Sequence, residues 1–104
     1  MFRCDYATIM NRLDALFIQD LANLIYTEEL ERREINGKIY HMCTTDILAN
    51  SRLKWSKSEQ IYHFKSMSKY IDIIKKGIPG KRYIRIHFDL IEHDILERAL
   101  KDGN

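Results

Sequence analysis

The sequence predicts an α+β domain that is mostly helical, with a small antiparallel sheet and flanking N- and C-terminal helices. Three observations support this fold class. The first third of the chain repeats apolar residues at three- and four-residue steps, as an amphipathic helix does. Ser56 and Glu59 have the spacing of a capping box, which marks the start of a later helix. Residues 82–88 alternate between polar and apolar side chains, which is typical of a half-buried strand.

Length and charge limit the possibilities further. The chain has 104 residues, of which 45% are apolar, enough for one compact core, so we expect a single domain spanning residues 1–104. The net charge is only +2, but it is uneven: the segment from Lys54 to Arg85 carries nine Lys and Arg residues and two acids. Any anion-binding surface should therefore lie in that segment.

The N-terminal apolar stripe predicts a long helical region. One helix from Tyr6 to Glu34 would be unusually long, so we expect a break near residues 12–14 and a solvated helical end at residues 28–33. Asn36-Gly37 then stops the helix or makes a turn. The stripe consists of Ile9, Leu13, Leu16, Phe17, Leu21, Leu24 and Ile25.

The middle of the chain predicts a strand followed by two helices. Residues 38–43 favour a short strand. Thr44 or Thr45 caps a helix that runs to about residue 51, and Leu53 and Trp55 should fill the core from the turn that follows. The helix after the capping box should run for about 15 residues, with Ile61, Phe64, Met67 and Ile71 inward and Ser58, Glu59, Tyr62, Lys65, Ser66 and Lys69 outward.

The C-terminal part predicts a hairpin and a last helix. Residues 71–75 are extended, and a Gly-Ile-Pro-Gly turn leads into the strand of residues 82–88, where Ile84, Ile86 and Phe88 share one face. Asp89 and Glu92 then offer a second capping pattern for a helix over residues 90–100.

This order of elements is that of a winged helix-turn-helix, a fold that most often binds nucleic acid. Two segments resemble winged-helix proteins of phages and prophages, of the replication initiator or replisome organiser type: residues 13–21, and the basic hairpin from Lys76 to Ile86. The resemblance covers about residues 13–88. It implies a DNA-binding protein, encoded by a mobile element, that acts in regulation or replication.

In such proteins the third helix and the wing are thought to contact duplex DNA. Backbone contacts would come from the basic hairpin and the start of the third helix, and Tyr62, Ser66 and Lys69 would supply any sequence preference. Glu59 would repel phosphate unless its capping role holds it back. The resemblance implies contacts by Lys57, Ser58, Tyr62, Lys65, Ser66, Lys69, Lys75, Lys76, Lys81 and Arg82, and Lys54 would lie on the same side.

Other interpretations remain open. The hairpin lysines also fit a solubilised hairpin protected against edge pairing. The same basic face would suit a protein-binding winged-helix adaptor or inhibitor of a host nucleic-acid machine, and an RNA-binding regulator is a third class. Exposed tyrosines could stack on single-stranded bases; the candidates are Tyr40, Tyr62, Tyr70 and Tyr83.

The sequence favours no enzyme, cofactor or metal. The four histidines have no metal-ligand spacing, and His41 next to Cys43 resembles a nucleophile–base pair only in sequence. Two cysteines suggest reduced thiols in the cytoplasm, and we expect neither a signal peptide nor a membrane span.

The outer helices carry more apolar residues than a small sheet needs. We therefore expect the regions of residues 9–25 and 90–100 to pair two protomers, which would present two wings to a two-fold DNA site.

Overall fold

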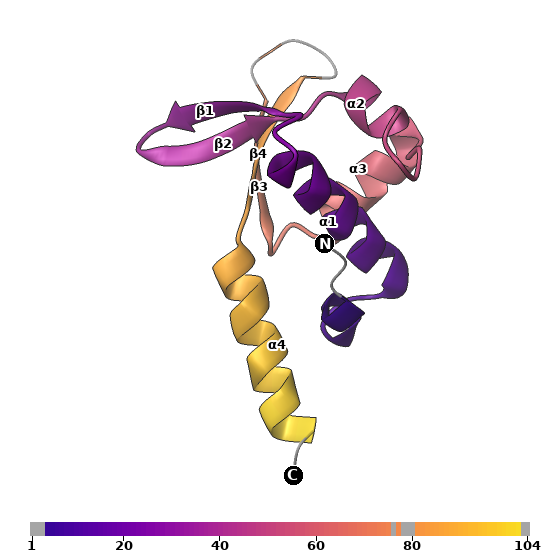
Figure 1. The fold of residues 1–104 in the computed structure, drawn as a ribbon, viewed down its shortest axis with the longest axis vertical. Helices are drawn as coiled ribbons and strands as arrows, with labels where there is room; N and C mark the ends of the chain where they lie inside the picture. Colours follow the sequence, from indigo (N-terminus) through magenta and orange to yellow (C-terminus); the bar gives the residue numbers. More distant parts are fainter. Residues whose placement is uncertain (1–3, 76, 78–80, 103–104) are drawn as a thin grey trace.

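The computed structural model describes residues 4–75, 77 and 81–102. Figure 1 shows the elements along the chain. In chain order they are η1 (Cys4–Thr8), α1 (Arg12–Tyr26), β1 (Glu31–Ile35), β2 (Lys38–Met42), α2 (Thr45–Ala49), α3 (Lys57–Ser66), β3 (Ile71–Lys75), β4 (Arg82–Ile86) and α4 (Phe88–Asp102).

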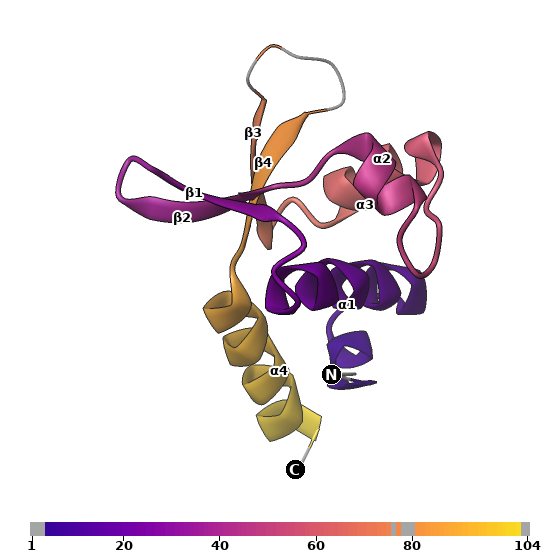
Figure 2. The ribbon, with the colours of Figure 1, turned by 45° about the horizontal axis from the view of Figure 1, so that its top comes forward.

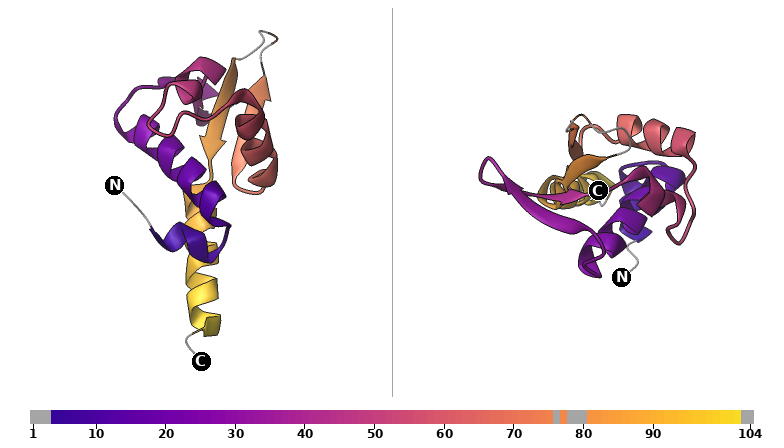
Figure 3. Two further views of the ribbon diagram at one scale, coloured as in Figure 1. Left: turned by 90° about the vertical axis from the view of Figure 1, so that its right-hand side faces the viewer. Right: turned by 90° about the horizontal axis from the view of Figure 1, so that it is seen from above.

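The strands form one antiparallel sheet in the order β1-β2-β4-β3. Between β2 and β4 the register joins only His41 to Ile84 and Met42 to Tyr83. The β1–β2 hairpin therefore extends beyond the rest of the sheet, as Figures 1 and 2 show. Helices α1, α2 and α3 lie together to one side of the sheet (Figure 3). The α+β class, the antiparallel sheet and the terminal helices are as predicted.

One aromatic cluster joins α1 to α3 and to the loop before α3. The ring of Phe17 on α1 meets Trp55 edge-on at 5.1 Å and Phe64 edge-on at 4.9 Å, and it stacks on His63. All four side chains are buried. Edge-to-face aromatic pairs add to the stabilisation that burial alone provides. Buried aliphatic residues complete this core; they include Ile18, Leu21, Leu48, Met67, Ile84 and Ile91.

Two buried carboxylates on α1 hold the segment that follows α2. One Oδ2 atom of Asp20 accepts hydrogen bonds from Ser51 Oγ and Trp55 Nε1, both at 2.8 Å. Asp14 Oδ1 lies 2.6 Å from His63 Nδ1. Buried carboxylates require partners of this kind, because an unpaired charge inside a protein is strongly destabilising. The helices are thus joined by directional bonds as well as by apolar contact.

The helical end predicted for residues 28–33 is wrong. The α1 helix ends at Tyr26, and Glu28 has a φ of 58° at the point where the chain reverses. Residues 31–35 form β1, which pairs with β2 across the two-residue turn Asn36-Gly37, where φ is 52° and 78°. Positive φ at both central residues is the conformation of the tight hairpin turn that Asn-Gly favours. Pairing with β2 therefore overrides the local helical preference of the charged residues.

Several predicted boundaries and inward side chains also differ. The break before α1 lies at residues 9–11, where Asn11 caps the helix, and α3 has ten residues rather than about 15. Leu53 is 44% exposed and Ile61 is 60% exposed, so neither fills the core; Trp55 alone does so from the turn. Phe88 begins α4 instead of ending the strand. The inward positions of Phe64, Met67 and Ile71 are confirmed.

Helix α4 projects from the rest of the molecule (Figure 1). It packs against η1, and the molecule measures 49 Å along its longest axis. Within the described ranges, none of the helices has the length and apolar character needed to cross a bilayer.

Replacing Asp20 should destabilise the fold. Asp20→Ala would leave Trp55 Nε1 without its partner in the core, at a cost of about 1–3 kcal/mol in the free energy of unfolding. Urea unfolding measures this loss. Glu34→Ala, at an exposed β1 position, is the control and should change stability by less than about 0.5 kcal/mol. Equal effects of the two variants would contradict the assignment.

Candidate functional site

The start of α3 is set by its capping box. Glu59 N donates to Ser56 Oγ at 3.2 Å, and Ser56 N donates to Glu59 Oε1 at 2.8 Å. The bond from the Ser56 amide lowers the pKa of the Glu59 carboxyl. The carboxylate is thereby held at the helix end, as the capping pattern predicts, instead of extending from the outer face of α3.

The outer face of α3 carries the predicted contact residues. Lys57, Ser58, Tyr62 and Lys65 are all exposed, and Tyr62 exposes 61% of its surface. Ser66 is exposed as well, but its hydroxyl donates to Asp14 Oδ2 at 2.8 Å. Ser66 is therefore engaged in holding α3 against α1, and the other four side chains are available for a partner.

A groove of about 390 Å³ runs between α3 and the β3–β4 hairpin. Lys65 comes from α3, and Lys75 and Arg82 come from paired positions of β3 and β4. The structure thus brings the basic helix and the base of the basic hairpin to one site. The described residues that line the groove are Ile61, Phe64, Lys65, Ser68, Ile71, Ile73, Lys75 and Arg82.

Arg82 lies inside the wall of this groove and does not extend outward. Its guanidinium lies 4.4 Å from the Phe64 ring centroid and donates to Gln60 Oε1 at 2.6 Å and Thr45 Oγ1 at 3.3 Å. Burial lowers the pKa of this guanidinium. Gln60 is itself buried and donates to the Trp55 carbonyl at 3.0 Å. Arg82 therefore joins β4 to α2 and α3.

Lys69 faces α4 rather than the groove. Its Nζ lies 2.8 Å from Asp94 Oδ2, which also accepts from the Tyr70 hydroxyl at 2.7 Å. These contacts, that of Lys69 foremost, lower the pKa of Asp94 to about 2. The Asp94 bond in turn raises the pKa of Lys69. A role for Lys69 in sequence preference would require it to leave this pair.

The remaining described lysines of the predicted contact set lie outside α3 and outside the groove lining. Lys54 is exposed in the loop before α3, with a φ of 51°, and Lys81 is exposed next to β4. Lys76 lies outside the described residues, as does the turn of residues 78–80.

Of the four tyrosines considered for base stacking, Tyr62 is exposed, whereas Tyr40, Tyr70 and Tyr83 are each 8% exposed. Of these four tyrosines, Tyr62 is the one whose ring could stack on a base.

Ile61 is the residue of this site that the sequence interpretation missed. Its four-residue spacing from Lys57 and Lys65 places all three on one stripe of α3, beside the groove. Since the helix is amphipathic, an isoleucine on it was expected in the core. The signal that could have placed Ile61 on the outer face of α3 is the presence of a lysine four positions before it and another four positions after it.

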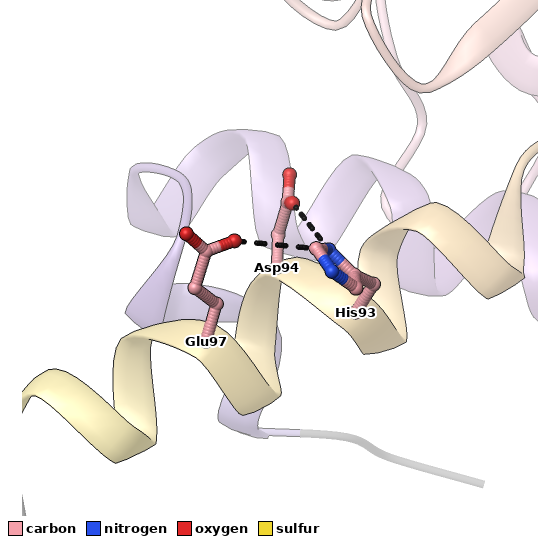
Figure 4. A group of neighbouring side chains, drawn as sticks. All are labelled: His93, Asp94 and Glu97. Carbon is pink, nitrogen blue, oxygen red and sulfur yellow. Dashed lines mark hydrogen bonds and ion pairs between the residues drawn. The ribbon is translucent and has the colours of Figure 1, made fainter.

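One group of possible metal ligands occurs among the described residues (Figure 4). His93, Asp94 and Glu97 on α4 have ligand atoms within 4.8 Å of one another. However, Asp94 Oδ2 already binds Lys69 and Tyr70, so a cation would have to compete with an ammonium group. The cluster is accounted for as an ion-pair network between α4 and the turn after α3.

His41 and Cys43 do not form a reactive pair. Cys43 is fully buried, and this burial raises the pKa of its thiol to about 11. Burial also lowers the pKa of His41. A nucleophilic cysteine requires an accessible thiolate, which this environment disfavours.

Comparison with known proteins yields no relative: the chain matches no protein-family model, no curated protein and no solved structure.

Arg82 should contribute to stability. Arg82→Ala would remove the bond to the buried Gln60 Oε1 and the contact with Phe64, which should lower the free energy of unfolding by about 1–3 kcal/mol. Chemical denaturation measures the change, and Lys81→Ala, at the exposed neighbouring position, is the control. An unaltered midpoint for Arg82→Ala would show that the guanidinium is not structural.

The ion pair between Lys69, in the turn after α3, and Asp94 on α4 should depend on pH. Because the folded-state pKa of Asp94 is about 2 and its ordinary value is 3.8, its contribution to stability is complete above about pH 4. The contribution is lost as the pH falls from 3.8 to 2. Asp94→Asn should therefore lower the melting temperature at pH 7, and its difference from the wild type should vanish near pH 2. Thermal unfolding followed by circular dichroism measures both, and a difference independent of pH would contradict the pairing.

Proposed function

We propose that the chain is a winged helix-turn-helix protein that binds duplex DNA through α3 and the β3–β4 hairpin. The order of α1, β2, α2, α3, β3 and β4, with β2, β4 and β3 as sheet neighbours, supports this assignment. In this interpretation β2 is the first strand of the winged helix, and β1 is an additional strand that forms a hairpin with it. The β3–β4 hairpin is the wing, and α4 follows it.

The observation that carries the proposal is the meeting of Lys65 and Lys75 at one groove. Lys57 lies two turns before Lys65 on the same stripe of α3. Lysines from two elements on one surface can follow a phosphate backbone, which supplies most of the affinity in nonspecific DNA binding. With Glu59 held in the capping box, few acids oppose such contacts.

Ser58 and Tyr62 are the residues proposed to contact base edges. Both are exposed and lie one turn apart on α3, between the lysine stripe and the side that Ser66 attaches to α1. Hydroxyl groups bond to several bases, so this pair would give a modest sequence preference. Arg82 and Lys69 are left out of the contact set because both are bonded within the protein.

The biological role proposed with this activity is regulation or replication for a mobile element in the cytoplasm. It follows from the likeness of residues 13–21 and 76–86 to phage replication initiators and replisome organisers. The activity itself needs no chemistry beyond binding.

The test is the salt dependence of DNA binding. Lys57→Ala combined with Lys65→Ala should weaken binding of a labelled duplex to all sequences alike. It should also reduce the slope of log affinity against log salt by about 1.8, for two lost phosphate contacts. Fluorescence anisotropy measures both effects.

The matched control combines Lys38→Ala with Lys101→Ala, which removes the same charge from the β1–β2 hairpin and from α4. It should leave the slope unchanged. No binding by the wild-type protein at low salt, or equal losses in both double variants, would refute the proposal.

A further inference from the structure

Helix α4 has one side directed toward the body of the protein. Ile91 is fully buried, and Asp94 binds Lys69 and Tyr70. Ile95 packs against the core from the same side. These three residues define the attached side of α4.

The opposite side of α4 is both exposed and apolar. Leu96 is 60% exposed and Leu100 is 65% exposed, and Asp89, seven residues before Leu96, is exposed on the same stripe. The helix carries five acids and two bases, so its charge is negative. The outer side of α4 thus carries two exposed leucines and the exposed acid Asp89, on a helix of net negative charge.

The groove between α3 and the β3–β4 hairpin has the complementary character. Ile61 is 60% exposed at its edge, and Phe64, Ile71 and Ile73 form further apolar lining. Lys65, Lys75 and Arg82 are its ionisable residues, and none of the described residues that line it is acidic. An apolar groove with a basic rim has the features that bind an acidic, apolar helix.

We propose that α4 of a second copy docks in this groove, with Leu96 and Leu100 against Ile61 and the acids of α4 near Lys65 and Lys75. The contact is head-to-tail, because two different surfaces meet. This proposal does not depend on DNA binding by the protein. If the protein also binds DNA, an α4 helix in the groove would prevent Lys65 and Lys75 from contacting phosphates.

Pairing through two copies of α4 is the competing arrangement, and charge disfavours it. Two helices of the same negative charge would face each other, whereas docking in the groove joins opposite charges. Pairing through α1, which the sequence also predicted, has little surface available, because Phe17, Ile18 and Leu21 are buried in the core.

Sedimentation velocity without DNA tests the proposal. The wild-type protein should associate as its concentration rises from about 10 μM to about 1 mM, and added salt should weaken the association. Ile61→Gln in the groove and Leu96→Gln on α4 should each weaken it about tenfold or more, and Lys65→Glu should do the same. Leu13→Gln, at an apolar α1 position that is 59% exposed, is the control and should have no effect.

Mixing two variants distinguishes docking in the groove from pairing of α4 helices. The Leu96→Gln protein retains an intact groove, and the Ile61→Gln protein retains an intact α4. An equimolar mixture should therefore form a one-to-one complex that neither variant forms alone. If α4 helices paired with each other, the Ile61→Gln protein would still associate by itself, and adding the Leu96→Gln protein would form no further complex.

Three results would overturn the proposal. They are a wild-type protein that stays monomeric at every concentration, a mixture that regains no complex, and a loss of association in Leu13→Gln as large as in Ile61→Gln. Because DNA is absent from these measurements, their outcome is separate from that of the salt-dependence experiment.

Discussion

The position of α3 depends on buried carboxylates of α1. Asp14 and Asp20 lie six residues apart on that helix, and each binds a group from the segment that follows α2: Asp20 holds the loop at Trp55, and Asp14 holds α3 at His63. A buried carboxylate tolerates few arrangements, because it must keep its partners. These bonds therefore determine which side of α3 faces the core and which side faces outward.

The outward side of α3 follows from this constraint. With His63 and Ser66 directed toward Asp14 and Phe64 in the core, the stripe through Ile61 and Lys65 must lie beside the β3–β4 hairpin. Arg82 closes that junction from β4 by its bond to Gln60. The groove thus results from how the helix is held. Its lysines come from positions that the core does not use, and its apolar lining combines the exposed Ile61 with edges of core residues such as Phe64 and Ile71.

Periodicity predicted the elements whose signals are local. The capping box at Ser56, the alternation of residues 82–86 and the apolar stripe of α1 each describe a structure within one segment. The capped helix, the strand and the N-terminal helix are all observed, although Leu13 of the stripe is 59% exposed and Tyr83, predicted on the polar face of the strand, is buried. The strand β1 was missed because its charged residues favour a helix locally, and only pairing with β2 across Asn36-Gly37 makes them extended. Likewise, no local pattern distinguishes Arg82, bonded to Gln60, from an exposed basic residue such as Lys81.

The same two lysines enter both proposed interactions, and thermodynamic linkage then couples them. If α4 of a second copy and duplex DNA both require Lys65 and Lys75, each partner lowers the apparent affinity of the other by the same factor. Self-association, which combines an apolar contact at Ile61 with ion pairs, should weaken less steeply with salt than phosphate contact does. Raising the salt concentration therefore shifts the competition toward self-association, and lowering the protein concentration shifts it toward DNA. Under the two proposals, a groove that is both apolar and basic would make DNA binding depend on protein concentration, without any second site or conformational change.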